Sequence, residues 1–226
     1  MAHDWDRAAN GVVLFGGAIV VRAVVITVAL VQILRGELTD LSLAFGVAVA
    51  LGQIATTVIG AAGILRFGRA VPQPSRKQAS FAALCFASVV AAECYALWVG
   101  LRVRELGAHG LAEVSLPPEL AAHVARVPTV AVVATVAAFV GLLLVLLAIG
   151  SVAERLHAEP LTKRAGDLVL ALLGFALSYA IIMNWPALAS GWVAVASLLG
   201  LAAFGLGTLV AYIWLSVRIV RLMRAA

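Results

Sequence analysis

Residues 128–153 read PTVAVVATVAAFVGLLLVLLAIGSVA and contain no charged residue. A helix needs about 20 consecutive apolar residues to cross the hydrocarbon core of a bilayer, and this stretch exceeds that length. Five other stretches are similarly apolar. The six predicted transmembrane segments are approximately 11–34, 41–65, 79–101, 128–153, 168–185 and 190–217. Because lipid cannot satisfy exposed backbone N–H and C=O groups, each segment is expected to be an α-helix.

The composition of the whole chain indicates the same class of protein. Of its 226 residues, 64% are hydrophobic and 12% are charged, and the mean hydropathy is +1.09. A soluble domain is nearer half apolar and a quarter charged. No polar stretch is long enough to form a second domain. We therefore predict one all-α domain over residues 1–226, a polytopic six-helix transmembrane bundle whose first partner is the lipid bilayer.

The basic residues gather on one side of the predicted segments, which fixes the expected topology. Arg35, Arg102, Arg104 and Arg126 lie on one side, and Arg22 lies within a segment. The other side holds Arg7, Arg66, Arg69, Arg76, Lys77, Arg155, Lys163, Arg164, Arg218, Arg221 and Arg224. The positive-inside rule therefore predicts cytoplasmic N- and C-termini in a multi-pass protein of a membrane such as the bacterial plasma (inner) membrane.

The formal net charge of +5 does not indicate nucleic-acid binding. The basic residues sit at the ends of apolar segments, where they meet phosphate headgroups. They form no extended patch with interleaved aromatic residues, so we expect no nucleic-acid partner.

The N-terminal segment is expected to remain in the membrane. Residues 1–10 are polar, and the apolar run that follows them is too long for the core of a signal peptide. No small-residue cleavage pattern stands at the end of that run.

The connection 102–127 is the only long one between predicted segments, and we expect it to be an outer loop. Within it, Pro117-Pro118 precedes ELAAHVARV, a pattern typical of a short helix with proline in its first turn. That helix would have an apolar face and a charged face. It is therefore predicted to lie along the membrane surface.

Two opposite charges lie at membrane depth, Arg22 in the first segment and Glu93 in the third. At about 1.5 Å per residue, the two positions fall within about 5 Å of the same depth. An unpaired charge at mid-bilayer costs at least about 2.5 kcal/mol. We therefore predict an ion pair between Arg22 and Glu93. It is either a structural clamp between helices or part of a gate or of a proton- or ion-coupled site.

Small and polar residues follow one face of two segments. In the second segment Gln53, Thr56 and Thr57 form a polar stripe that continues through Gly60 and Gly63. This stripe either packs against another helix or lines a pore or solute cavity. In the sixth segment the stripe of small residues is Ala196, Gly200, Ala203, Gly207 and Ala211. It is expected to support close packing, within the bundle or between protomers.

The chain carries no motif of a known catalytic or cofactor site. H-E-x-x-H, G-x-S-x-G, C-x-x-C and a Gly-rich phosphate loop are all missing from the sequence. No histidine lies in an apolar segment to ligate a buried haem, and no lysine lies there to form a Schiff base. We therefore expect no enzyme activity, no cofactor and no resident metal.

Two functions from different classes fit these features. The first is a small-solute or ion transporter or channel with a mid-membrane polar site formed by Gln53, Thr56, Thr57, Glu93 and Arg22. The second is a non-catalytic structural or assembly subunit of a larger membrane complex, in which the same groups only hold helices together. Homo-oligomers or membrane-complex partners are consistent with both, and a helix count alone does not distinguish them.

Overall fold

The fold is a computed structural model that describes residues 4–34, 43–108, 116–184 and 191–226. Its described residues form helices and no strands. The six helices are α1 (Trp5–Leu34), α2 (Leu43–Ala70), α3 (Ser75–Ala108), α4 (Pro118–Arg155), α5 (Glu159–Asn184) and α6 (Gly191–Ala225). All six are long and apolar enough to cross a membrane. The chain is therefore an all-α protein with the character of a multi-pass membrane protein.

The helices extend beyond the predicted segments, mostly at the ends that carry charge. α2 continues to Ala70, and α5 begins at Glu159 instead of 168. The connection between α4 and α5 is consequently short, with a left-handed backbone at His157 (φ 53°). Apolarity marks only the part of a helix that lies in hydrocarbon, whereas the helix itself continues into the interface. The six segments were located correctly, and their polar ends were not.

The predicted outer loop 102–127 is wrong in its extent. α3 continues to Ala108, and α4 begins at Pro118 and runs without interruption past Pro128 to Arg155. The expected interfacial helix is therefore the first part of α4. Proline is tolerated in a first turn, and a membrane helix can also accommodate one in its interior. Only residues 109–115 of this connection lie outside the described residues.

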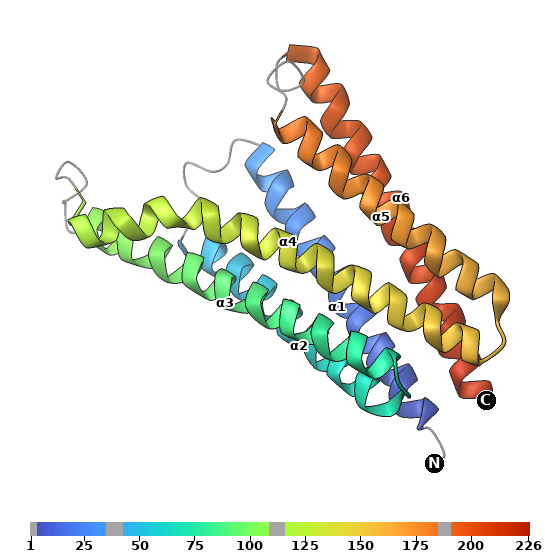
Figure 1. Cartoon of the computed structure of the whole chain (residues 1–226). Coiled ribbons are helices and arrows are strands. Elements are labelled where there is room, and N and C mark those ends of the chain that lie inside the picture. Colours follow the sequence, from blue (N-terminus) through green and yellow to red (C-terminus); the bar gives the residue numbers. More distant parts are fainter. Residues whose placement is uncertain (1–3, 35–42, 109–115, 185–190) are drawn as a thin grey trace.

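The helices form a closed ring in chain order. Each packs against its neighbours in sequence, and α6 also packs against α1. We call the end of the bundle that holds the described start of α1 and the end of α6 the terminal end, and the opposite one the distal end. The helices converge at the terminal end, whereas the α5–α6 hairpin diverges from α3 and α4 toward the distal end (Figure 1).

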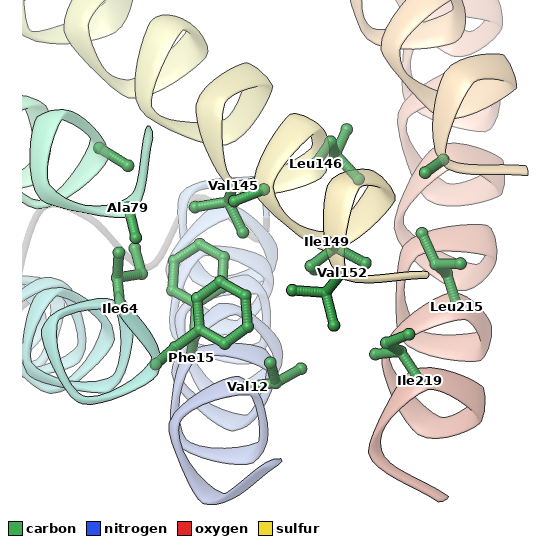
Figure 2. Close-up of a cluster of buried hydrophobic side chains, with 14 of the residues drawn as sticks. Val12, Phe15, Ile64, Ala79, Val145, Leu146, Ile149, Val152, Leu215 and Ile219 are labelled. Atoms are coloured by element: carbon green, nitrogen blue, oxygen red, sulfur yellow. The ribbon is translucent and has the colours of Figure 1, made fainter. Parts of the chain in front are cut away.

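The apolar core fills the terminal half of this fork. Phe15, Ile64, Ile149, Leu215 and Ile219 are almost fully buried in one cluster that draws on α1, α2, α4 and α6 (Figure 2). Phe15 makes an edge contact with Tyr212 of α6, with ring centroids 6.1 Å apart. Leucines and valines elsewhere remain exposed on the helices, as expected where lipid is the solvent.

The basic residues identified in the sequence occupy helix ends rather than loops. Arg66 and Arg69 lie in the last turns of α2, Arg76 in the first turn of α3, and Arg164 near the start of α5. Arg221 lies near the end of α6. All of these helix ends belong to the terminal end, so the positive charge surrounds the packed half of the bundle.

Candidate functional site

Arg22 and Glu93 lie in contact at the membrane-depth positions that their sequence spacing indicated. Arg22 is on α1 and Glu93 is on α3. The guanidinium Nη2 donates a hydrogen bond of 2.6 Å to Glu93 Oε1, which makes this an ion pair. The Glu93 side chain is 15% exposed and the Arg22 side chain 32%. The pair is therefore only partly desolvated, with the carboxylate better enclosed than the guanidinium.

Thr57 of α2 connects the two charges. Arg22 Nη1 donates a hydrogen bond to Thr57 Oγ1. Thr57 Oγ1 lies 3.1 Å from Glu93 Oε2 and 2.9 Å from the Gln53 carbonyl oxygen. A hydroxyl has one proton, so it donates to one of these two acceptors at a time. The polar site therefore joins α1, α2 and α3.

Gln53 contributes its backbone carbonyl to this site. Its carbonyl oxygen accepts hydrogen bonds from the hydroxyls of Thr56 (2.8 Å) and Thr57 (2.9 Å). Arg22 Nη1 lies 3.5 Å from the same oxygen. A threonine hydroxyl that bonds to the preceding turn of its own helix is satisfied in lipid without a partner helix. The buried Thr56 hydroxyl is satisfied by this bond within α2. Of the two threonines, only Thr57 contacts both Arg22 and Glu93.

A cavity of about 310 Å³ lies beside the ion pair, between α1, α3 and α4. Arg22 and Glu93 are the charged residues of its wall, Thr135 adds a hydroxyl, and the remainder is apolar. Gln53, Thr56 and Thr57 are not part of this wall. Of the predicted site, the two charges therefore line the cavity. The α2 stripe lies outside the cavity wall and contacts the charges through Thr57 and the Gln53 carbonyl oxygen.

A second cavity of about 240 Å³ lies between α4, α5 and α6. Phe139 and Leu142 of α4 line both cavities. The walls of the second are almost wholly apolar, and Phe175 of α5 stacks between Phe139 and Phe204, with ring centroids 5.9 and 6.1 Å apart. The first cavity lies on the distal side of the core. The second adjoins the core, since its walls include the core residues Leu146, Leu168, Leu172 and Tyr212.

The glycines of α2 lie at a close crossing with α1. A Cβ atom added to Gly63 would lie 2.8 Å from the Gly11 carbonyl oxygen, and one added to Gly60 would lie 3.3 Å from the Phe15 ring. A Cβ added to Gly11 would lie 2.5 Å from the Phe67 backbone nitrogen. The backbones can approach this closely only because these positions lack side chains. The sequence pattern identified Gly60 and Gly63 but not their partner, Gly11.

The small-residue stripe of α6 has a different environment. A Cβ added to Gly200 or Gly207 would meet no described atom within 4 Å, and Ala203 is exposed. Only Ala211, near the terminal half, packs on the core. The side chain of Ala196 lies outside the described residues. Close packing of Gly200 and Gly207 within the bundle is therefore not found in the described part of the chain. Packing between protomers stays a prediction.

One further cluster had no signal in the sequence. Tyr95 on α3 lies 3.0 Å, through its hydroxyl oxygen, from Nδ1 of His123 on α4, and 3.2 Å from the His123 carbonyl oxygen. Trp98 contacts the same imidazole edge-on, with ring centroids 5.1 Å apart. These contacts join residues far apart in the chain, and they fix the α3–α4 pair near its distal end. Among the described residues, no three metal-binding side chains are grouped to hold an ion.

The fold and site define an all-helical membrane-protein class. No family model, curated protein or solved structure matches the chain. The function must therefore be inferred from the ion pair, the cavities and the fork.

Proposed function

We propose that the protein is a transporter or channel for a small solute or ion, with Arg22 and Glu93 as its mid-membrane polar site. The observation that carries this proposal is the position of the ion pair in the wall of a cavity of about 310 Å³. Pairing alone satisfies both charges at membrane depth, so a structural clamp does not require a cavity beside it. Charges at membrane depth that face a cavity are typical of substrate or ion pathways.

The distribution of packing supports the same proposal. The apolar core lies between the cavity and the terminal end, whereas the helices diverge on the distal side. Transport by alternating access requires a site that is open to one side at a time. The arrangement is consistent with a state that is closed toward the terminal end. A cation bound beside Glu93 would weaken its attraction for Arg22 and so loosen the contact between α1 and α3.

Reconstitution in liposomes tests this proposal. The probes are protons, Na⁺, K⁺ and Cl⁻, followed by ion-sensitive dyes, and glycerol, followed by osmotic swelling. We expect flux of at least one probe above that of protein-free liposomes. We expect Glu93→Gln to reduce it at least tenfold. The matched control is Glu105→Gln, because Glu105 lies on the same helix but pairs with Arg102 on an exposed surface.

A second variant keeps the test decisive if Glu93→Gln does not fold. Ala134 lines the same cavity from α4, which carries neither charge, so Ala134→Leu would fill the space and leave both charges in place. It should reduce flux while the melting temperature in detergent is retained. Wild-type protein that is folded and inserted but carries none of the probes would contradict the proposal, as would unchanged flux in both variants.

The alternative, a non-catalytic subunit of a larger membrane complex, is favoured by the second cavity. Its apolar walls on α4, α5 and α6 match the apolar side chains that another membrane helix would bring. Purification from native membranes in a mild detergent distinguishes the two. A stoichiometric partner that remains bound after size-exclusion chromatography, together with absent flux, would support the subunit. Neither proposal requires catalysis.

We further propose that both termini are cytoplasmic and that the membrane is a bacterial plasma membrane. The support is the concentration of basic residues at the terminal end, as the positive-inside rule requires. Fusion of alkaline phosphatase and of a fluorescent protein to the C-terminus tests the orientation. Fluorescence without phosphatase activity is expected, and the reverse result would overturn the proposed topology.

A further inference from the structure

A groove of about 420 Å³ lies on the surface of the bundle between α1 and α6, at the terminal end. It lies away from the ion pair and shares no lining residue with the two cavities already described. Val12, Val20 and Ile213 are among its apolar walls. Two arginines, Arg221 and Arg224, belong to the same lining. None of the described lining residues is acidic, so the groove is apolar along its length apart from Ser216 and positive at one end.

Two glycines give the groove its depth. Gly16 and Gly17 lie on α1, and a Cβ added to either would meet no described atom within 4 Å. Their missing side chains therefore leave space along the α1 surface. The adjoining contacts hold α1 and α6 together beside this space, since Phe15 packs on Tyr212 and the Arg224 guanidinium donates to Asn10 Oδ1 at 3.2 Å.

The length and charge of the groove match one leaflet of a bilayer. Ile213 and Arg224 are separated by about 16 Å along α6, at 1.5 Å per residue, and half of a bilayer's hydrocarbon core is about 15 Å thick. The arginines lie at the end of α6 where the headgroups of that leaflet would be. Asn10 holds the Arg224 guanidinium toward α1, and the Arg221 side chain is exposed.

We propose that this groove binds an anionic phospholipid, with its phosphate at Arg221 and Arg224 and one acyl chain along Gly16 and Gly17. A phospholipid accounts for both parts of the groove, the arginines at one end and the apolar channel beside them. An arginine guanidinium suits a phosphate because it presents a planar set of N–H donors. The apolar channel next to it suits a chain that is already in the membrane. The site would bind lipid regardless of what the protein transports or assembles with.

Native mass spectrometry of the full chain in detergent tests the assignment, with phosphatidylglycerol and phosphatidylcholine as matched probes. We expect one phosphatidylglycerol to be retained in preference to phosphatidylcholine. Each arginine at an anionic headgroup contributes about a fivefold gain in affinity. Arg221→Gln should therefore weaken phosphatidylglycerol retention about fivefold, and Arg221→Gln/Arg224→Gln about 25-fold. Retention of phosphatidylcholine should not change.

Two further variants separate the headgroup from the chain. Arg218→Gln is the matched control, because Arg218 lies one turn away, stacks on Trp214 at 5.4 Å and does not line the groove. It should retain the lipid as the wild type does. Gly17→Leu has space for its side chain, so it should fold normally and weaken retention by filling the channel.

Several outcomes would overturn the proposal. Equal retention of the two lipids, or equal losses for Arg218→Gln and Arg221→Gln, would mean that charge anywhere on this end suffices. Unchanged phosphatidylglycerol retention in Gly17→Leu would show that the acyl chain does not lie in the groove. Displacement of phosphatidylglycerol by millimolar inorganic phosphate would show that the arginines recognise a free anion rather than a lipid. Melting temperatures of all variants ensure that a folded protein is compared.

Discussion

The terminal and distal halves of the bundle are built from the same six helices but differ in how those helices meet. In the terminal half, α1 and α2 approach backbone to backbone at Gly11 and Gly63, and apolar side chains fill the space between helices. In the distal half, the helices fork, a cavity opens between them, and the ion pair of Arg22 and Glu93 lies in its wall. Packing stabilises the first half, whereas polar contacts hold α1, α2 and α3 together in the second.

This difference follows from the nature of the solvent. Lipid tails are as apolar as leucine, so burial of apolar surface gives little drive for helix association in a membrane. Close backbone approach, dense packing and hydrogen bonds must supply it instead. The terminal half uses close backbone approach and dense packing, whereas the ion-pair site uses hydrogen bonds. The distal half can therefore contain cavities. The comparison predicts that mutations in the two halves fail in different ways.

The largest expected effect comes from the α1–α2 crossing. Gly11→Leu would place a Cβ atom 2.5 Å from the Phe67 backbone nitrogen, so the helices must separate. Overpacking commonly costs about 1–3 kcal/mol, and here rigid backbone raises the expected loss to about 3 kcal/mol or more. Thermal unfolding in detergent measures it. The control is Gly100→Leu, in the distal half, where a new Cβ meets no described atom within 4 Å. Equal destabilisation by the two changes would contradict the packing difference.

The second effect concerns the ion pair itself. Arg22→Ala or Glu93→Ala leaves one charge without its partner at membrane depth. Each should lower the free energy of unfolding by about 2–3 kcal/mol. This is less than for a fully buried pair, because both side chains are partly exposed. The double variant should lose less than the sum of the singles, with a coupling energy of about 1–2 kcal/mol. Unfolding of all four proteins in the cycle gives this value. Strict additivity would mean that the contact contributes nothing to the distal half.

The sequence was informative about features that depend on one helix at a time. Apolar length located all six helices, and the rise per residue placed Arg22 and Glu93 at matching depth. The stripe of α2 identified Thr57 as a candidate, although nothing in the pattern showed that it alone of the two threonines touches both charges. Periodicity shows which residues share a face, but not which face meets which helix.

Features that depend on several helices could not be predicted. The fork and its cavities depend on the tilt between the α5–α6 hairpin and α3–α4, and no local pattern encodes that tilt. The contact between Tyr95 and His123 likewise requires two helices in register. The error in the predicted outer loop arose from its prolines. Pro117 and Pro118 mark the start of α4 itself, whereas Pro128, which lies inside α4, was taken as the start of a new segment.

A smaller effect is expected where Thr57 bridges the two charges. Thr57→Val keeps the shape of the side chain but removes the hydroxyl that accepts from Arg22 and lies beside Glu93. Hydrogen bonds between membrane helices are worth about 0.6 kcal/mol on average and about 1.7 kcal/mol at most, so we expect a loss of about 1 kcal/mol. Thr27→Val is the matched control, because its hydroxyl bonds only to Ala23 of the same helix. A larger loss in Thr27→Val than in Thr57→Val would contradict the bridging role.

The smallest effect is expected on the lipid-facing surface of the diverging hairpin. Leu177 on α5 is 64% exposed, so Leu177→Ala exchanges contacts with lipid for other contacts with lipid and should change the unfolding free energy by less than about 0.5 kcal/mol. Leu215→Ala, at a fully buried position of α6, should cost about 2–5 kcal/mol by leaving a cavity in the terminal half. Unfolding of both variants in the same detergent compares them directly. A large loss for Leu177→Ala in native membranes but not in detergent would show that a partner covers this face. A second copy of the chain and another membrane protein could each form that interface, and the mass of the complex purified from native membranes distinguishes them.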